Sequence, residues 1–164
     1  FSVRAQAALL ELEEAEARSR AEQAISSGEA AEAFRRMVEA QGGDPRVVDD
    51  PAAVLPAAPE VFPVVAEASG YLAGVDAENI GRIAADLGAG RARKGDPVDP
   101  AVGLTLAVKV GTRVDGGEEI GRIHARDSEA ARDAAARLLA SLRWSENPVS
   151  PPPLVYGWRE SPNG

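Results

Sequence analysis

The sequence has 164 residues, a net charge of −8 at pH 7, and hydrophobic residues at 45% of its positions, of which few are aromatic. This composition suits a core of aliphatic side chains, and the negative charge argues against nucleic-acid or anionic-membrane partners because like charges repel. Cysteine is absent, which excludes disulfides and thiolate metal sites, and no apolar run is long enough to span a bilayer. We expect a cytoplasmic protein.

The chain opens with a predicted helix. From about residue 3 to residue 26 it is rich in alanine, glutamate, arginine and leucine, and Ser27-Gly28 interrupts the pattern. The first residues, Phe1-Ser2-Val3, lack an initiator methionine, and the helical pattern begins almost immediately after them. We therefore interpret the chain as a piece of a longer protein.

A second helix is predicted from Glu29 to the Gly42-Gly43 pair. Asp44-Pro45 suits the cap and first position of a short helical turn through Val48. Residues 49–59 contain three prolines and little periodicity, so we interpret them as a linker and a domain boundary. The apolar stripe of the second helix contains Ala33, Phe34, Met37 and Val38.

Two strands are predicted after this linker. Residues 61–66 favour the first strand, and Pro63 indicates a position at the edge of a sheet because proline cannot donate a backbone hydrogen bond. Ser69-Gly70 favours a turn, and residues 71–75 favour a second strand.

The stretch from Gly81 to Ile123 is the most constrained part of the sequence. Asp76 is expected to cap a helix over residues 77–87, whose apolar residues recur on one face and which ends at Gly88. A glycine-rich basic turn then follows, within a few residues of the helix end.

Beyond this turn, Pro97 and Pro100 exclude a return to helix. Apolar residues alternate from Val102, which predicts a buried strand. Gly111 and the Gly116-Gly117 pair divide the next residues into short antiparallel strands, which we expect to form a tight hairpin.

The last helix is expected to be capped by Ser128. Residues 148–164 contain five prolines and predict an extended tail, and Tyr156 and Trp158 offer apolar area that could dock this tail on the body of the protein. The expected apolar face of the last helix contains Ala131, Ala134, Leu138, Leu139 and Leu142.

Three separately spaced segments carry a resemblance to a known family. They read AQGGDPRVVDDP, SGYLAGVDAENIG and LGAGRARKGDPVDPAVGLTLAVKVGTRVDGGEEIGRIHA. In this order they resemble the C-terminal region of the thymidine and pyrimidine-nucleoside phosphorylases, and the resemblance covers about Gly28 to Asp127. Members of that family carry several hundred residues before the matching region.

The resemblance implies a pentosyltransferase of nucleoside salvage. Phosphate attacks the anomeric carbon of a pyrimidine nucleoside, which releases free base and a pentose 1-phosphate, with phosphate as co-substrate and no cofactor. The resemblance also implies a homodimer that is formed by N-terminal helices. The sequence does not separate thymidine from uridine preference. This chain alone is expected to be catalytically silent and to complete the upstream domain and assist its closure over the nucleoside.

The basic turn is the one candidate for substrate binding. Arg91, Arg93 and Lys94 follow Gly88 and Gly90, and guanidinium groups and exposed backbone N–H groups suit phosphate. The turn follows a helix rather than opening one, however, so its cations also complement the negative end of the helix dipole. We favour this structural interpretation and keep the three residues as weak candidates.

His124 is the only histidine in the chain. With Asp127 and Glu118 or Glu119 nearby it could act as a general base, but a lone histidine at a strand end is more often structural, and we assign no catalytic residue. The first helix carries four carboxylates without histidine partners, which suits solvent better than a metal ion. These carboxylates belong to Glu11, Glu13, Glu14 and Glu16.

The segment VKVGTRVDGGEEIGRI also resembles the second half of a biotinyl or lipoyl carrier domain. Such carriers present a lysine at the tip of the hairpin that follows this motif, whereas this chain has residues 124–127 there and places Lys109 before the turn. The carrier and a non-catalytic interaction module are therefore the alternatives to the phosphorylase interpretation.

We predict an α+β chain with an N-terminal helical arm, a small antiparallel barrel-sandwich-like sheet with an inserted helix, and a C-terminal packing helix. Residues 1–48 are expected to belong to the upstream body of the enzyme, and residues 49–59 to form a linker. Residues 60–147 are expected to form the phosphorylase C-terminal-like domain, and residues 148–164 a proline-rich tail.

Overall fold

The computed structural model describes residues 4–5, 7, 10, 12–91 and 93–157. It divides the chain into two compact units, which we describe separately: Phe1–Leu55 with Leu154–Gly164, and Pro56–Pro153. Among the described residues, no helix is both long and apolar enough to cross a membrane.

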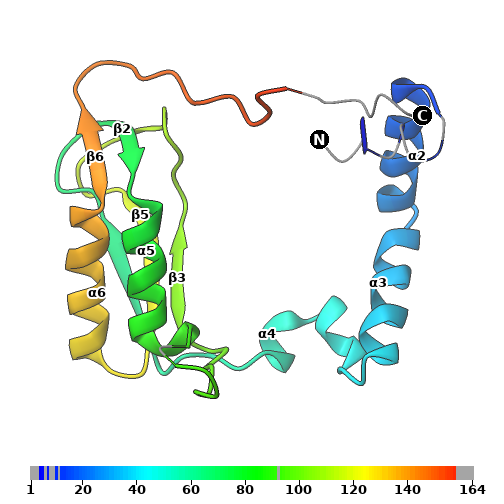
Figure 1. The fold of residues 1–164 in the computed structure, drawn as a ribbon, viewed down its shortest axis with the longest axis horizontal. Helices are drawn as coiled ribbons and strands as arrows, with labels where there is room; N and C mark the ends of the chain where they lie inside the picture. The colour runs from blue at the N-terminus through cyan, green and yellow to red at the C-terminus, as the bar shows by residue number, and fades with distance from the viewer. Residues whose placement is uncertain (1–3, 6, 8–9, 11, 92, 158–164) are drawn as a thin grey trace. The chain divides into compact units, whose positions relative to one another are not determined.

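The first unit contains helices α2 (Glu14–Ser26) and α3 (Glu29–Ala40) (Figure 1). Gly28 adopts a φ of 84° between them, a conformation that glycine tolerates best. The expectation of one helix over residues 3–26 was wrong, because Leu12 and Glu13 are not helical. Glu13 has an extended backbone there, and no glycine or proline in the sequence marks the break.

Two short helical turns follow α3. The predicted turn is η1 (Pro45–Val48), and the Asp44 side chain accepts a hydrogen bond from the backbone N–H of Arg46. The interpretation of residues 49–59 as unpatterned was wrong in part, because they include α4 (Pro51–Val54). Asp50-Pro51 repeats the Asp-Pro combination that starts η1, since an aspartate cap followed by proline favours a helix start.

The described residues of the second unit form six strands in two antiparallel sheets of three strands each. The first sheet has the order β1 (Glu60–Val65), β5 (Glu119–Ala125), β3 (Gly103–Leu106). The second has the order β4 (Arg113–Val114), β2 (Gly70–Val75), β6 (Leu142–Ser145). The α+β class is confirmed, although the single barrel-like sheet is replaced by two small sheets, and neither is a closed barrel.

The glycine pair that was expected to form a tight hairpin instead connects the two sheets. β4 pairs with β2, whereas β5 pairs with β1 and β3. The turn between β4 and β5 is fixed by hydrogen bonds from Gly117 N–H to the Ala66 carbonyl and from Ala66 N–H to the Glu118 carbonyl. The glycines therefore mark a corner at which the chain changes sheets.

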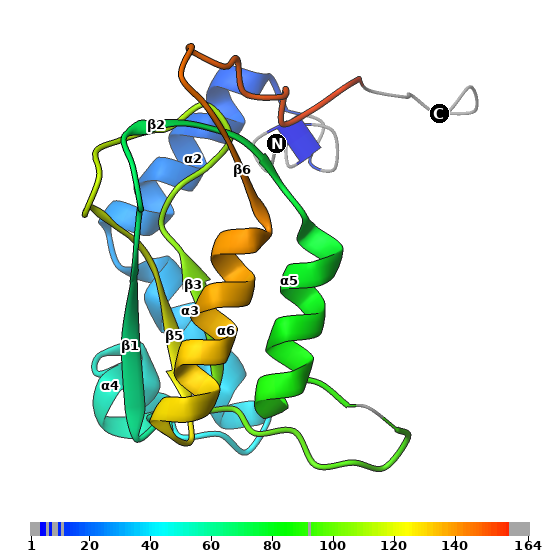
Figure 2. The ribbon, with the colours of Figure 1, turned by 90° about the vertical axis from the view of Figure 1, so that its left-hand side faces the viewer.

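Two helices lie side by side in this unit (Figures 1 and 2). Helix α5 (Ala77–Ala84) is capped by Asp76 as predicted, whereas α6 (Ser128–Ala140) is capped by Asp127 rather than by Ser128. α6 packs on β1 and β5, and the shared core joins both sheets to both helices. The largest fully buried side chains are Leu72, Ile83, Ile120, Ile123, Leu138, Val64 and Val114.

Strand β6 was not predicted, because Leu142 was assigned to the apolar face of the last helix. The segment instead leaves α6 at Ser141 and pairs with β2. In the tail that follows, Tyr156 is 86% exposed. Docking of this residue on the body of the protein stays a prediction. Trp158 lies outside the described residues.

Candidate functional site

The glycine-rich basic turn lies at the end of α5. The helix continues as the π-helical segment η2 (Ala85–Ala89), in which Gly88 has a φ of 108°, and the chain then turns away. The backbone N–H of Asp99 donates a hydrogen bond of 2.9 Å to the Gly88 carbonyl, which closes residues 88–99 into a loop. We call residues 88–101 the basic loop.

Asp99 fixes the far end of the basic loop. Its carboxylate accepts a hydrogen bond of 3.0 Å from the Ala101 backbone N–H and pairs with the Arg126 guanidinium at the end of β5. The hydrogen bond from Ala101 and then the pairing with Arg126 hold the pKa of the Asp99 carboxyl below its ordinary value. The half-buried Asp99 therefore ties the loop to the sheet.

The three candidate cations of the basic loop are exposed to solvent. The backbone N–H of Arg93 donates to the Asp96 carboxylate at 2.7 Å, which makes a local turn. In the described part of the chain, the side chains of Arg91, Arg93 and Lys94 have no carboxylate partner. A nearby hollow is lined by Leu87, Gly88, Pro97, Val98, Asp99, Pro100 and Arg126, so these three side chains are not gathered around it.

His124 lies half-buried on β5, opposite Val61 of β1 and Gly103 of β3. The carboxylates that the sequence places near it have other partners. Glu119 pairs with Arg122 at 2.7 Å, and Asp127 accepts hydrogen bonds from the first turn of α6.

Glu118 likewise accepts a hydrogen bond from the Asp115 backbone N–H at 2.9 Å. Among the residues that the structure describes, there is therefore no base–orienter pair at His124. Within the described ranges, no group of three histidine, aspartate or glutamate side chains is placed to hold a metal ion.

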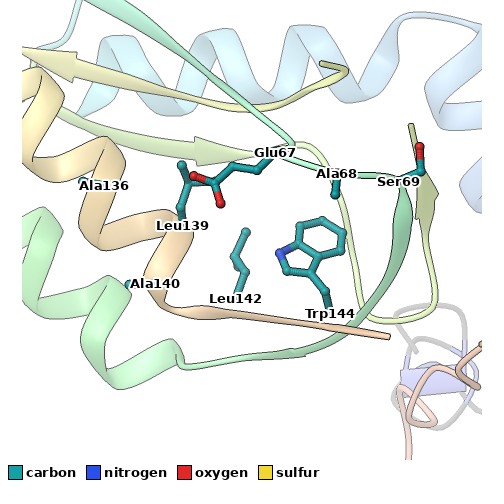
Figure 3. Close-up of a pocket in the computed structure, with 8 residues that line it drawn as sticks. All are labelled: Glu67, Ala68, Ser69, Ala136, Leu139, Ala140, Leu142 and Trp144. Carbon is teal, nitrogen blue, oxygen red and sulfur yellow. The ribbon is translucent and has the colours of Figure 1, made fainter. Parts of the chain in front are cut away.

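A groove of about 530 Å³ lies between the C-terminal end of α6, β6 and the segment before β2 (Figure 3). Sequence reasoning missed this groove because it missed β6, which brings Leu142 and Trp144 beside the helix. The alternation of these two apolar residues with Arg143 was the available signal for a strand. The groove is lined by Glu67, Ala68, Ser69, Ala136, Leu139, Ala140, Leu142 and Trp144.

Comparison with known proteins identifies the second unit. The pyrimidine nucleoside phosphorylase C-terminal domain family matches residues 71–145, from the second residue of β2 to the end of β6. Residues 71–145 are thus similar to the pyrimidine nucleoside phosphorylase C-terminal domain. The resemblance seen in the sequence is thereby confirmed, and the biotinyl or lipoyl carrier is not favoured.

Individual relatives extend the similarity beyond this C-terminal domain. A thymidine phosphorylase of Burkholderia orbicola is 41% identical over 140 residues, which cover 85% of this chain and 32% of that protein. A pyrimidine-nucleoside phosphorylase of Geobacillus stearothermophilus is 40% identical over 141 residues, which cover 86% of this chain and 32% of that protein. The chain spans about a third of the length of these relatives.

The C-terminal domain includes the whole basic loop, and the loop's tie to β5 gives a testable expectation. Replacement of Asp99 with asparagine should speed amide hydrogen exchange in residues 88–101 about fivefold, because the pairing with Arg126 is lost. Exchange measured by mass spectrometry would show this. Asp115→Asn, which breaks an exposed pair with Arg113 elsewhere, should leave the loop unchanged.

The contacts of the Asp99 carboxylate also predict how protection of the basic loop from hydrogen exchange depends on pH. The pKa of Asp99 is lower in the folded chain than its unfolded value of about 3.9, so its stabilising effect is complete above that value and is lost as pH falls through the folded pKa. Loop protection, corrected for intrinsic exchange, should therefore be constant from neutral pH down to about 5 and fall only in stronger acid. Loop protection in Asp99→Asn equal to that of the unaltered chain would contradict this role.

Proposed function

We propose that this chain is the C-terminal part of a thymidine or pyrimidine-nucleoside phosphorylase. The whole protein would use phosphate to cleave a pyrimidine nucleoside into free base and a pentose 1-phosphate. The observation that carries this proposal is the 41% identity with a thymidine phosphorylase over 85% of the chain, together with the family match over residues 71–145. These matches favour the same chemistry for the whole protein.

The catalytic groups of that enzyme lie upstream of this chain. The described residues offer no base–orienter pair at His124, and the carboxylates near it are engaged in a turn, an ion pair and a helix cap. Phosphorolysis of this kind needs positioning of phosphate and stabilisation of an oxocarbenium-like transition state rather than covalent catalysis. The chain's role is to complete the larger domain and to help it close over the nucleoside.

The domain organisation follows from this role. Residues 1–48 belong to the upstream body, residues 49–59 link it to the C-terminal domain at residues 60–147, and residues 148–164 form the tail. The partners are the upstream catalytic part, a pyrimidine nucleoside and phosphate, in a cytoplasmic homodimer without a cofactor. Arg91, Arg93, Lys94 and His124 are the residues to mutate first if the chain alone proves active.

Release of free thymine or uracil tests the proposed function. The product of the whole gene and the 164-residue chain would each be incubated with thymidine or uridine, with and without phosphate, and free base would be measured by chromatography. We expect phosphate-dependent release by the whole protein, and none by the chain alone. Release by the chain alone would place the active site within it, and a whole protein inactive on both nucleosides would overturn the proposed reaction.

A further inference from the structure

Helix α3 carries an apolar face that the described residues of its own unit leave partly exposed. No residue of α3 is buried, and the residues Phe34 and Met37 are 47% and 48% exposed. Ala30 and Val38 lie on the same face at helical spacing, and Val38 is only half-buried. We call Ala30, Phe34, Met37 and Val38 the α3 stripe.

The opposite face of α3 already has its partners. The Arg35 guanidinium donates two hydrogen bonds to the Asp49 carboxylate, at 2.7 and 3.0 Å, and also pairs with Glu32. These contacts tie the polar side of α3 to the turn after η1 and leave the stripe facing away from it. The charged side of α3 is therefore engaged, whereas the described residues leave its apolar side largely uncovered.

A helix as short as α3 is stabilised by burial of its apolar face against another surface. α3 has 12 residues, and isolated helices this short are marginal in water, because most helix stability in proteins comes from burial of the apolar face. Two large apolar side chains that are half exposed on one stripe indicate a docking surface rather than a solvated face.

The comparisons show that α3 is shared with a longer protein. The match with the Burkholderia orbicola relative covers 85% of this chain, so it must include α3, although α3 lies outside the C-terminal domain family match at residues 71–145. About two thirds of that relative lies outside the match. Helix α3 is thus shared with a much longer phosphorylase without belonging to its C-terminal domain.

We propose that the α3 stripe docks on the upstream catalytic part of the same polypeptide. The proposal rests on the proposed function for the existence of that part. The stripe offers aliphatic, aromatic and thioether side chains, so the surface it meets is apolar, and α3 holds the C-terminal domain to the catalytic body.

Site-specific photocrosslinking in the whole gene product tests this proposal. Met37→benzoylphenylalanine places the reactive group in the stripe, and Glu39→benzoylphenylalanine, on the polar face of the same helix, is the matched control. Irradiation should yield intramolecular crosslinks from position 37 to residues upstream of this chain, and position 39 should yield none. Mass spectrometry of the crosslinked peptides identifies the contact.

Three outcomes would overturn the proposal: crosslinks between two copies, crosslinks to residues 56–153, or no crosslink at position 37. A second measurement uses Phe34→Gln with Met37→Gln, which should speed hydrogen exchange in α3 of the whole protein by about thirtyfold or more. Arg36→Gln with Glu39→Gln is its control, and equal exchange in the two double variants would also refute the docking. Base release by the unaltered protein is measured separately, so an inactive protein with the expected crosslinks refutes only the proposed reaction.

Discussion

Gly121→Ala is expected to lower the melting temperature of the C-terminal domain by more than about 10 °C, through a loss of about 3 kcal/mol. Gly121 is buried in β5, the central strand of the first sheet. A Cβ atom at this position would lie 2.4 Å from the backbone oxygen of Thr105 on β3. No real Cβ approaches so closely, and the oxygen belongs to a paired strand rather than to a flexible side chain.

The clash can be relieved only by moving β3 away from β5. That movement would weaken the pairing of Leu106 with Gly121 and of Leu104 with Ile123, and would open the core that these strands share with α6. Thermal unfolding followed by circular dichroism measures the effect. Small-to-large changes in well-packed interiors commonly cost about 1–3 kcal/mol of stability. We expect Gly121→Ala to lie at the upper end of this range, because the new Cβ atom meets backbone rather than a side chain that can move.

Gly81→Ala is the matched control, because it is the same chemical change with the opposite expectation. Gly81 lies in α5, and a Cβ there would meet no atom within 4 Å. Alanine has a higher helix propensity than glycine, so this variant should be more stable by roughly 0.5–1 kcal/mol. Equal melting temperatures for the two variants would contradict the packing that we describe around β5.

Local signals predicted some of the element boundaries. Asp76 caps α5 as its position before the helical pattern indicates, and Asp44-Pro45 starts η1. The end of α3 before Gly42 and the turn at Gly88 follow the preference of glycine for positive φ. These features depend on a few neighbouring residues, and so the sequence alone contains enough information to place them.

The assignment of strands to sheets could not be predicted in the same way. The chain between Arg113 and Ala125 has the signature of a hairpin, yet its two strands pair with partners in different sheets. That choice depends on β1 and β2, which lie about fifty residues earlier in the chain. β6 was missed for a related reason, because its four residues become a strand only by pairing with β2.

In the candidate site too, local features could be predicted from the sequence and long-range contacts could not. The cations of the basic loop are visible in the sequence, but the tie that holds the loop joins Asp99 to Arg126, which are 27 residues apart. The groove beside Trp144 is formed by α6, β6 and the segment before β2, so it cannot be predicted from any one stretch of the sequence. Sequence patterns identify chemical groups, whereas their neighbours are set by the long-range pairing of strands.

Leu138→Ala is expected to destabilise the C-terminal domain by about 2–5 kcal/mol. Leu138 is fully buried on α6, and its cluster includes residues of both sheets and of α5. Truncation removes the transfer free energy of the side chain and leaves a cavity that the rigid strands cannot fill completely. Leu154→Ala deletes the same atoms at a position that is 97% exposed, so it should change stability by less than about 0.5 kcal/mol.

In the whole protein, Leu138→Ala tests whether the C-terminal domain contributes to stability alone or also to catalysis. If the catalytic groups lie upstream, the variant should keep normal kcat and KM at temperatures well below its melting point, because no group that touches the reacting atoms has changed. Its activity should then fail at a lower temperature than that of the unaltered protein, together with loss of near-ultraviolet dichroism. A reduced kcat while the domain is still folded would contradict a purely supporting role. It would mean that the packing of the C-terminal domain affects the active site directly.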